Sequence, residues 1–444
     1  MNETITIIGA GLAGCEAAFQ MANAGFKVNL YEMRPKIQTG AHTTDQFAEL
    51  VCSNSLGSNL PDRASGVLKN ELRRLNSFLM QVADEVALPA GGALAVDRDS
   101  FSEKITNILY SHPNIQVIRE EVKEIPQTPT IIASGPLTSS ALSASIAKLT
   151  NSDHLFFYDA IAPIVNFDSI DMDTAFKASR YQRGDDLDGD YINCPFSKEE
   201  YERFINELIN AERIELRKFE SQINEGVVAG KFFEGCLPIE VLAKRGLNSL
   251  AFGPLRPVGI WNPHNKSRPY AVLQLRQDNI AGTLYNLVGF QTNLKFEEQK
   301  RVFRMIPGLQ SATFARYGQM HRNTFIASPK LLLPTLQFHQ REDLFFAGQI
   351  TGIEGYVGNI ATGLLAGINL SRFLSGNKLL IMPKETMLGA LIHYITNADL
   401  RDFQPMKANF GILPQIHVEG KRERAKAFAH MARTSLENYL NSIT

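Results

Sequence analysis

A short apolar segment that runs into three spaced glycines constrains the fold of this chain more than any other feature. Ile5 to Ile8 are all apolar or β-branched, and Gly9-x-Gly11-x-x-Gly14 follows at once. The first glycine permits a tight turn, the second lets a pyrophosphate approach the backbone, and the third lets the next helix pack on the sheet. We therefore expect a strand, a turn and a helix, the last from about Leu12 to Ala24, that bind a dinucleotide.

A carboxylate in the expected place strengthens this prediction. A second predicted strand, 27–31, ends at Glu32, and a carboxylate there would meet the ribose hydroxyls of the adenosine. The N-terminus of the helix would offer unpaired N–H groups to the pyrophosphate. A glycine-rich turn without a ligand is the alternative interpretation, and the strand, the helix and Glu32 together count against it.

Length and composition indicate a globular protein of two or three domains. The chain has 444 residues, of which 44% are hydrophobic and 20% charged, and its formal net charge is −1. A balanced charge excludes a global polycation, so any RNA-binding surface would be a local patch. We find no apolar stretch that could cross a membrane and no signal peptide, and we expect a cytoplasmic protein without a membrane partner.

The cysteine pattern argues against a metal site and against a disulfide framework. The four cysteines are scattered, with neither a C-x-x-C pair nor a histidine at ligand spacing. We therefore expect no metal and reduced thiols. The cysteines are Cys15, Cys52, Cys194 and Cys236.

The order of patterns predicts an α/β fold whose Rossmann-like cofactor domain is split in sequence. Strand and helix patterns alternate over 1–152, including a helical pattern over 64–86. Short candidate strands, among them 191–195, 258–261 and 271–276, then indicate an inserted α+β domain over 153–334. The α/β pattern returns over 335–444, with a strand at 344–348, a glycine-spaced helix at 360–374 and a C-terminal helix.

Five longer motifs carry a resemblance to a known family. They are Gly9–Gly14 with Tyr31–Pro35, Ala48–Leu56, Pro89–Arg98, Phe233–Glu240 and Ala347–Gly352. Together they closely resemble the FAD-containing, folate-dependent tRNA uracil-5-methyltransferases, which are related to the GidA-type tRNA-modifying flavoproteins. The resemblance runs from Ile5 to Gly411.

The resemblance implies an unusual methylation. A one-carbon unit from 5,10-methylenetetrahydrofolate would be placed on C5 of a uridine in the T-loop of tRNA and reduced to methyl by reduced FAD. NADPH or NADH would recharge the flavin. Because the chain has no second glycine fingerprint, we expect NAD(P)H to visit the flavin transiently.

The resemblance also assigns roles to residues. Cys236 matches the candidate uracil nucleophile, with Glu234 or Glu240 as candidates for moving protons, and Cys52 is placed close to the flavin. A thiolate that adds to C6 of uracil would make C5 nucleophilic. Both cysteines could instead be buried as small apolar residues. The residues predicted to bind the cofactor are Gly9, Ala10, Gly11, Leu12, Ala13, Gly14, Glu32, Gly135, Gly348, Gln349 and Gly352.

Several alternatives stay open at this point. The same chemistry could act on a uridine of ribosomal RNA, or the protein could be a flavin-binding RNA-modification scaffold that transfers no carbon. A flavin-dependent disulfide or pyridine-nucleotide oxidoreductase would need a redox cysteine pair and a second nucleotide fold. RNA contacts could come from basic and aromatic residues between Arg180 and Arg276, or from the basic stripe at 421–426.

Overall fold

A six-stranded sheet draws its strands from both ends of the chain. The computed structural model describes residues 4–39, 41–151, 155–182, 189–214, 237–401 and 403–443. The strand order is β16-β17-β7-β1-β2-β6, and every neighbouring pair is parallel except β16 with β17. The strands are β1 (Ile5–Ile8), β2 (Val28–Tyr31), β6 (Ile115–Ile118), β7 (Thr130–Ile132), β16 (Gln337–Phe338) and β17 (Arg341–Phe346).

The first helix packs closely on a helix from far along the chain. The two are α1 (Leu12–Asn23) and α12 (Tyr356–Leu374). A Cβ atom added at Gly363 of α12 would lie 2.2 Å from the carbonyl oxygen of Ala13, so glycine is required for this approach. The glycine spacing of the second helix therefore reflects packing as much as any ligand.

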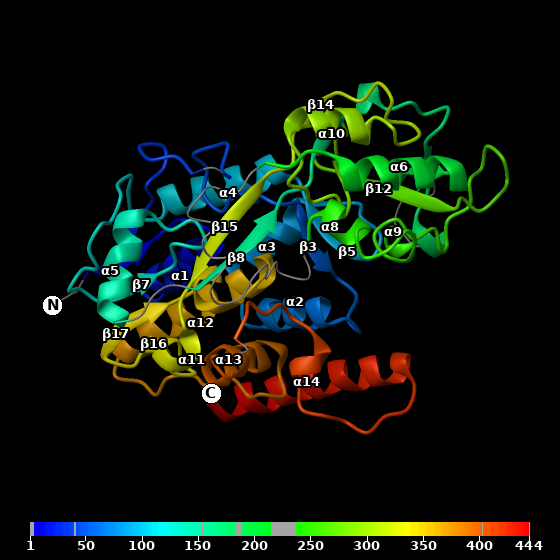
Figure 1. The fold of residues 1–444 in the computed structure, drawn as a ribbon. Helices are drawn as coiled ribbons and strands as arrows, with labels where there is room; N and C mark the ends of the chain where they lie inside the picture. The colour runs from blue at the N-terminus through cyan, green and yellow to red at the C-terminus, as the bar shows by residue number, and fades with distance from the viewer. Residues whose placement is uncertain are drawn as a thin grey trace.

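The remaining helices of the region built on the parallel sheet lie around that sheet and the α1–α12 pair (Figure 1). Most of them share an apolar core with residues from both ends of the chain, and two pack in a smaller core with Ile132 and Phe346. The helices are α2 (Ala64–Arg74), α3 (Phe78–Glu85), α4 (Arg98–Ser111), α5 (Ser140–Thr150), α11 (Ser328–Leu331), α13 (Met387–Asn397) and α14 (Lys421–Ile443).

The middle of the chain forms a second, wholly antiparallel sheet. Its order is β10-β11-β12-β13-β9-β14, and it has an apolar core of its own. The strands are β9 (Ile164–Asn166), β10 (Phe176–Lys177), β11 (Tyr191–Phe196), β12 (Ala271–Gln277), β13 (Leu284–Leu287) and β14 (Phe314–Arg316). The helices on it are α6 (Lys198–Asn210), α8 (Ile239–Ala243), α9 (Ser249–Phe252) and α10 (Phe296–Phe303).

Two small sheets connect these parts. We call the region built on the parallel sheet the cofactor part and the region built on the antiparallel sheet the inserted part. The antiparallel pair β8 (Leu155–Ala160) and β15 (Met320–Phe325) runs diagonally from the cofactor part to the inserted part in Figure 1. A three-stranded sheet joins β3 (Ser55–Ser58), β4 (Ala87–Leu88) and β5 (Ala93–Val96). The predicted α/β class, with a split parallel sheet and an inserted α+β part, is confirmed; the boundaries at 152 and 334 stay a prediction.

Two predicted elements differ from the structure. The helix expected over 64–86 is two helices, because Asn76 adopts a left-handed φ of 58° and Ser77 then caps α3 through its side chain. The strand expected over 258–261 is wrong. Gly259 has a φ of 81°, and the Ile260 N–H donates to the Pro257 carbonyl, so this segment turns instead of extending.

Candidate functional site

The glycine turn after β1 is built as a cradle for a ligand. Gly9 has a φ of 100°, and a Cβ atom there would lie 2.6 Å from the carbonyl oxygen of Ala133. A Cβ atom at Gly14 would lie 1.8 Å from the Gly9 oxygen. At Gly11, which caps α1, it would meet no atom within 4 Å. The first and third glycines are therefore packed against protein backbone, and the second faces open space at the positive end of the helix.

Glu32 is held as a carboxylate beside this turn. Its oxygens accept hydrogen bonds from the Ala10 N–H at 3.1 Å and from the backbone and side-chain N–H groups of Arg34 at 3.1 and 3.0 Å. Burial alone would raise the pKa of Glu32, but the charge and hydrogen bonds of Arg34 outweigh burial and lower it. The turn and the second strand are thus joined by an ionised carboxylate.

A first cavity lies over this turn. Four residues predicted to bind the cofactor line it, and they come from three strand ends of the parallel sheet: Gly9, Gly11, Glu32 and Gly135. A helix N-terminus, a glycine without a neighbouring side chain and a carboxylate are the groups that a dinucleotide requires. The residues present therefore fit the pyrophosphate and ribose of FAD.

A second cavity, of about 440 Å³, adjoins the first. The two share Pro136 and Leu137 as wall residues. The second cavity is lined by Cys52, Gln349 and Tyr356, together with Asn323 of β15 and other residues. A ligand whose pyrophosphate lies at the glycine turn could therefore extend past Pro136 to Cys52.

The hydroxyl of Tyr356 fixes the backbone of the cysteine loop. It accepts hydrogen bonds from the Cys52 N–H at 2.7 Å and from the Ser53 N–H at 3.1 Å. Burial is the main cause that raises the pKa of Tyr356, so the hydroxyl stays neutral. Because Tyr356 begins α12, this contact ties the cysteine loop to the C-terminal part of the cofactor fold.

Three arginines hold residues on either side of Cys52 or in the cavity wall. Arg98 donates to the Leu50 carbonyl, and Arg276 donates to the Asn54 side chain at 2.9 Å. Arg316 donates to the carbonyl of Ala41, a wall residue of the second cavity, at 3.2 Å. The arginines come from the start of the helix α4 and from β12 and β14 of the antiparallel sheet.

These arginines make the surroundings of Cys52 electropositive. Burial would lower the pKa of Arg98, but its ion pair with Asp278, at 2.9 Å, outweighs burial and raises it. Burial lowers the pKa of Arg276 and of Arg316, and the negative charge of a Cys52 thiolate opposes that effect at both. Nearby guanidinium groups favour the thiolate form of a cysteine. The site is therefore suited to a reactive thiol at Cys52.

The other residues predicted to bind the cofactor contact protein side chains or backbone in the structure. Ala13 lies against Gly363 of α12, and Gly348 packs on the side chain of Ala13. Gly352 faces the ring of Phe403, since a Cβ atom there would lie 2.6 Å from that ring. Ala10 acts through its N–H to Glu32, and Leu12 is buried in the core.

The cysteines and the acidic candidates fall into three groups. Cys236 and Glu234 lie outside the described residues. Cys15 and Cys194 are buried, and desolvation raises the pKa of both thiols, which makes them poor nucleophiles. Glu240 accepts from the Thr292 hydroxyl and the Asn293 N–H, and it lines neither cavity above, so its visible role is structural.

Sequence reasoning missed Arg276 and Arg316 as charges that act on Cys52. They are far from Cys52 in the chain, and they lie on β12 and β14 of the antiparallel sheet. Within the described ranges, no cluster of three or more metal-ligating side chains is found. In the same ranges, no helix combines the length and the apolar character needed to span a membrane.

Comparison with known proteins places the chain in a family. The family model described as glucose inhibited division protein A matches residues 4–378. The methylenetetrahydrofolate--tRNA-(uracil-5-)-methyltransferase TrmFO of Bacillus subtilis is 54% identical over 100% of both chains. The TrmFO of Enterococcus faecalis is 55% identical over 97% of each chain. The chain belongs to the TrmFO family.

A solved structure supports the fold of this TrmFO family member. GidA of Aquifex aeolicus, in its form II crystal, aligns with a TM-score of 0.69 over 99% of this chain and 74% of the GidA chain. The sequence identity is 16%, so this likeness bears on the fold alone. The resemblance seen in the five sequence motifs is confirmed.

Proposed function

We propose that this protein transfers a one-carbon unit from 5,10-methylenetetrahydrofolate to C5 of a uridine in the T-loop of tRNA. FAD is the proposed cofactor, and it supplies a hydride when reduced, with NAD(P)H as the electron source. The curated relatives carry this methyltransferase in their names. The single observation that carries the proposal is that the cavity over the glycine turn continues past Pro136 and Leu137 to Cys52.

The residues that would hold FAD follow from this arrangement. The Gly11 backbone and the N-terminus of α1 would face the pyrophosphate, and Glu32 would face the ribose. Gln349 and the start of α12 would face the flavin end, because both lie in the wall of the cavity that contains Cys52. Walls from the cysteine loop, β3, β15 and the start of α12 would limit water at the reacting atoms.

The pyrimidine chemistry requires a sulfur nucleophile. We assign this role to Cys236, on the resemblance of its motif. Its thiolate would add to C6 of uracil, and the electron pair of the C5–C6 double bond would make C5 nucleophilic toward the one-carbon unit. C5 would attack the methylene carbon of the folate, and loss of the C5 proton with release of tetrahydrofolate would leave an exocyclic methylene. Reduction of that methylene by a hydride equivalent, with release of the Cys236 thiolate from C6, would give the methyl group. Cys52, in its electropositive loop, would act on the cofactor side of the same cavity.

One experiment tests the proposed function. Purified protein is incubated with methylenetetrahydrofolate labelled on its methylene carbon, reduced nicotinamide and unmodified tRNA, and the label is then located by nuclease digestion. We expect the label in 5-methyluridine of the T-loop. Cys236→Ala should abolish transfer and retain the flavin absorbance. Label found only in a ribosomal RNA fragment offered in parallel, or in no RNA, would contradict the proposal.

A further inference from the structure

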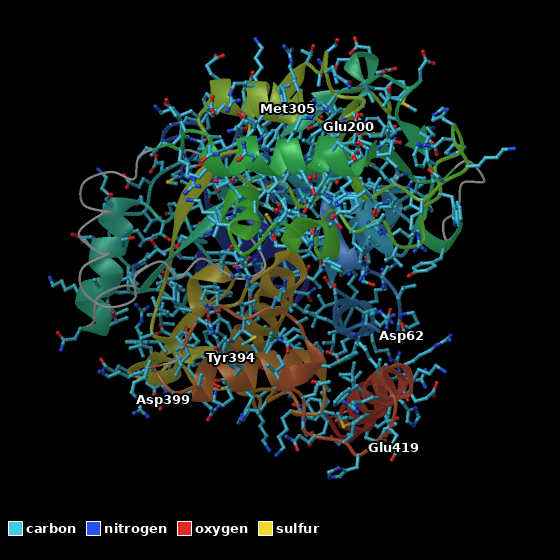
Figure 2. All side chains as sticks on the ribbon, turned by 45° about the vertical axis from the view of Figure 1, so that its right-hand side comes forward. Asp62, Glu200, Met305, Tyr394, Asp399 and Glu419 are labelled. Carbon is cyan, nitrogen blue, oxygen red and sulfur yellow. The ribbon has the colours of Figure 1, made fainter. Side chains whose placement is uncertain are left out.

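A wide groove lies next to the second cavity, between α2 and α14. Its volume is about 1210 Å³. The loop before α2, the segment after Phe410 and the first turns of α14 line it. Figure 2 shows Asp62, in that loop, on the same side of the molecule as α14, with Glu419 immediately before α14.

The groove and the cavity that contains Cys52 share two chain segments as walls. Ala64 lines the groove and Ser65, the next residue, lines the cavity. In the same way Ala408 lines the cavity and Phe410 lines the groove. These segments therefore lie between the cavity and the groove, and a polymer with one unit in the cavity would cross them to reach the groove.

Positive charge dominates the groove. Its charged lining comprises one carboxylate, that of Asp62, against four side chains that are cations at pH 7: Arg63, Lys421, Arg422 and Arg424. Asp62 forms an ion pair with Arg63 at 3.3 Å, so its charge is already compensated. Arg424 donates to the Val418 carbonyl at 3.1 Å and so anchors the loop before α14.

Two of these cations are available to a ligand. Lys421 and Arg422 are exposed on the first turn of α14, and neither has a hydrogen-bond or ion-pair partner among the described residues. The rings of Phe410 and Phe428 also line the groove and stack with centroids 5.1 Å apart, which makes part of the groove apolar and aromatic. Exposed cations in a groove with aromatic rings suit a phosphodiester chain with unpaired bases.

We propose that this groove binds the phosphate backbone of the RNA whose uridine enters the Cys52 cavity, with Lys421 and Arg422 as phosphate contacts. The inference rests on the proposed function and adds to it the surface that holds the RNA. The groove positions the substrate and takes no part in the chemistry.

The test is the double variant Lys421→Gln/Arg422→Gln, assayed as holoenzyme on unmodified tRNA. Both side chains lack partners in the described fold, so the variant should fold normally. The matched control is Lys123→Gln/Lys148→Gln, which makes the same change in charge at exposed residues in and near α5, on the other side of the cofactor part (Figure 1).

We expect the groove variant to raise KM for tRNA about tenfold at physiological salt, with kcat and flavin absorbance unchanged. The slope of log KM against log salt should fall by about 1.5, because two phosphate contacts are lost. The control should change KM less than about twofold, since surface charges far from the RNA act only through a screened field. A groove variant indistinguishable from the control, or one that lowers kcat alone, would overturn the proposal.

A binding assay separates this inference from the proposed function. If the enzyme without substitutions transfers no methyl to tRNA, the proposed function fails. Fluorescence titration with labelled tRNA then tests whether the groove binds RNA. Weaker binding by the groove variant with a smaller salt slope supports the proposal, and equal binding overturns it. Loss of binding to phosphatidylglycerol vesicles with full retention of RNA binding would also overturn it, in favour of a membrane contact.

Discussion

Cys52 lies on a loop that Arg98 and Arg276 hold at Leu50 and Asn54, and the chemistry proposed here depends on that loop. The sequence motif placed Cys52 near a flavin, but it could not show which charges would meet it. Arg316 is on β14 of the inserted sheet, and nothing in its local sequence marks it as a neighbour of the cysteine. The pairing of strands that are far apart in the chain brings Arg316 to the cysteine, and local sequence patterns do not encode that pairing.

The first prediction concerns the reactivity of Cys52. Arg316→Gln should slow alkylation of Cys52 by iodoacetamide at pH 7 about fivefold, because a positive charge that favours the thiolate is removed. Arg316→Lys should restore most of the rate. Mass spectrometry of the peptide containing Cys52 measures the reaction, and Lys148→Gln serves as the control. An unchanged rate in Arg316→Gln would show that this arginine does not influence the thiol.

A second prediction concerns Gly11. Its backbone φ of −77° is open to any residue, and a Cβ atom there meets nothing within 4 Å, so Gly11→Asp should fold normally. Aspartate is also a favoured N-cap. Its negative charge would stand where the pyrophosphate is expected, and FAD affinity should fall about a hundredfold. Flavin absorbance after gel filtration measures retention, and the melting temperature of the apoprotein is the control. A yellow Gly11→Asp protein would exclude the glycine turn as the pyrophosphate site.

At the scale of elements, the helices were predicted well where periodicity and caps agree. The first helix, expected from about Leu12 to Ala24, runs from Leu12 to Asn23, because it begins directly after its N-cap Gly11 and ends at its C-cap Ala24. The helix predicted over 64–86 failed at Asn76, since leucine periodicity continues across a break that only the left-handed residue reveals. The sequence could not show which side chains, distant in the chain, accept hydrogen bonds from the free N–H groups at the start of a helix.

One such helix end gives a prediction on pH. The Glu71 carboxylate, on α2, accepts from the N–H groups of Met387 and Leu388 at 2.7 and 2.8 Å and so caps α13. Burial raises the pKa of Glu71 from an ordinary value near 4.5 to about 8. Because the folded pKa is the higher one, the stabilisation is fully present below pH 4.5 and is lost as the pH rises through 8.

The comparison variant is Glu71→Gln, which cannot ionise. The melting temperature of the unmodified protein should exceed that of Glu71→Gln most at pH 5, and the difference should shrink steadily toward pH 8. Thermal unfolding followed by circular dichroism at both pH values measures this. A difference that grows with pH would mean that Glu71 caps the helix as a carboxylate with a lowered pKa.

At the scale of the whole molecule, the inserted part closes the site by direct polar contacts with the cofactor part. Arg98, at the start of α4, pairs with Asp278 after β12, and the side chains are 11% and 4% exposed. The Ile280 N–H also donates to Asp97 at 2.6 Å. The order of strand patterns in the sequence predicted that the cofactor fold is split. It did not predict this junction, because the residues of the junction belong to separate motifs.

The junction gives the next prediction. Asp278→Asn leaves the buried Arg98 charge without its partner and should lower the free energy of unfolding by about 3 kcal/mol. Asp399→Asn removes an exposed ion-pair partner of Arg401, and its cost should be much smaller. Urea denaturation followed by fluorescence compares the two variants. Equal, small losses would show that the Arg98–Asp278 pair does not hold the two parts together.

The central claim is that a flavin ring lies in the cavity that contains Cys52, while the pyrophosphate lies at the glycine turn. A crystal structure of the protein loaded with FAD measures this most directly. We predict the pyrophosphate over the Gly11 backbone and the isoalloxazine ring in van der Waals contact, about 4 Å, with the Cys52 side chain. An isoalloxazine ring outside the walls formed by Gln349 and Tyr356, with Cys52 out of its reach, would contradict the account.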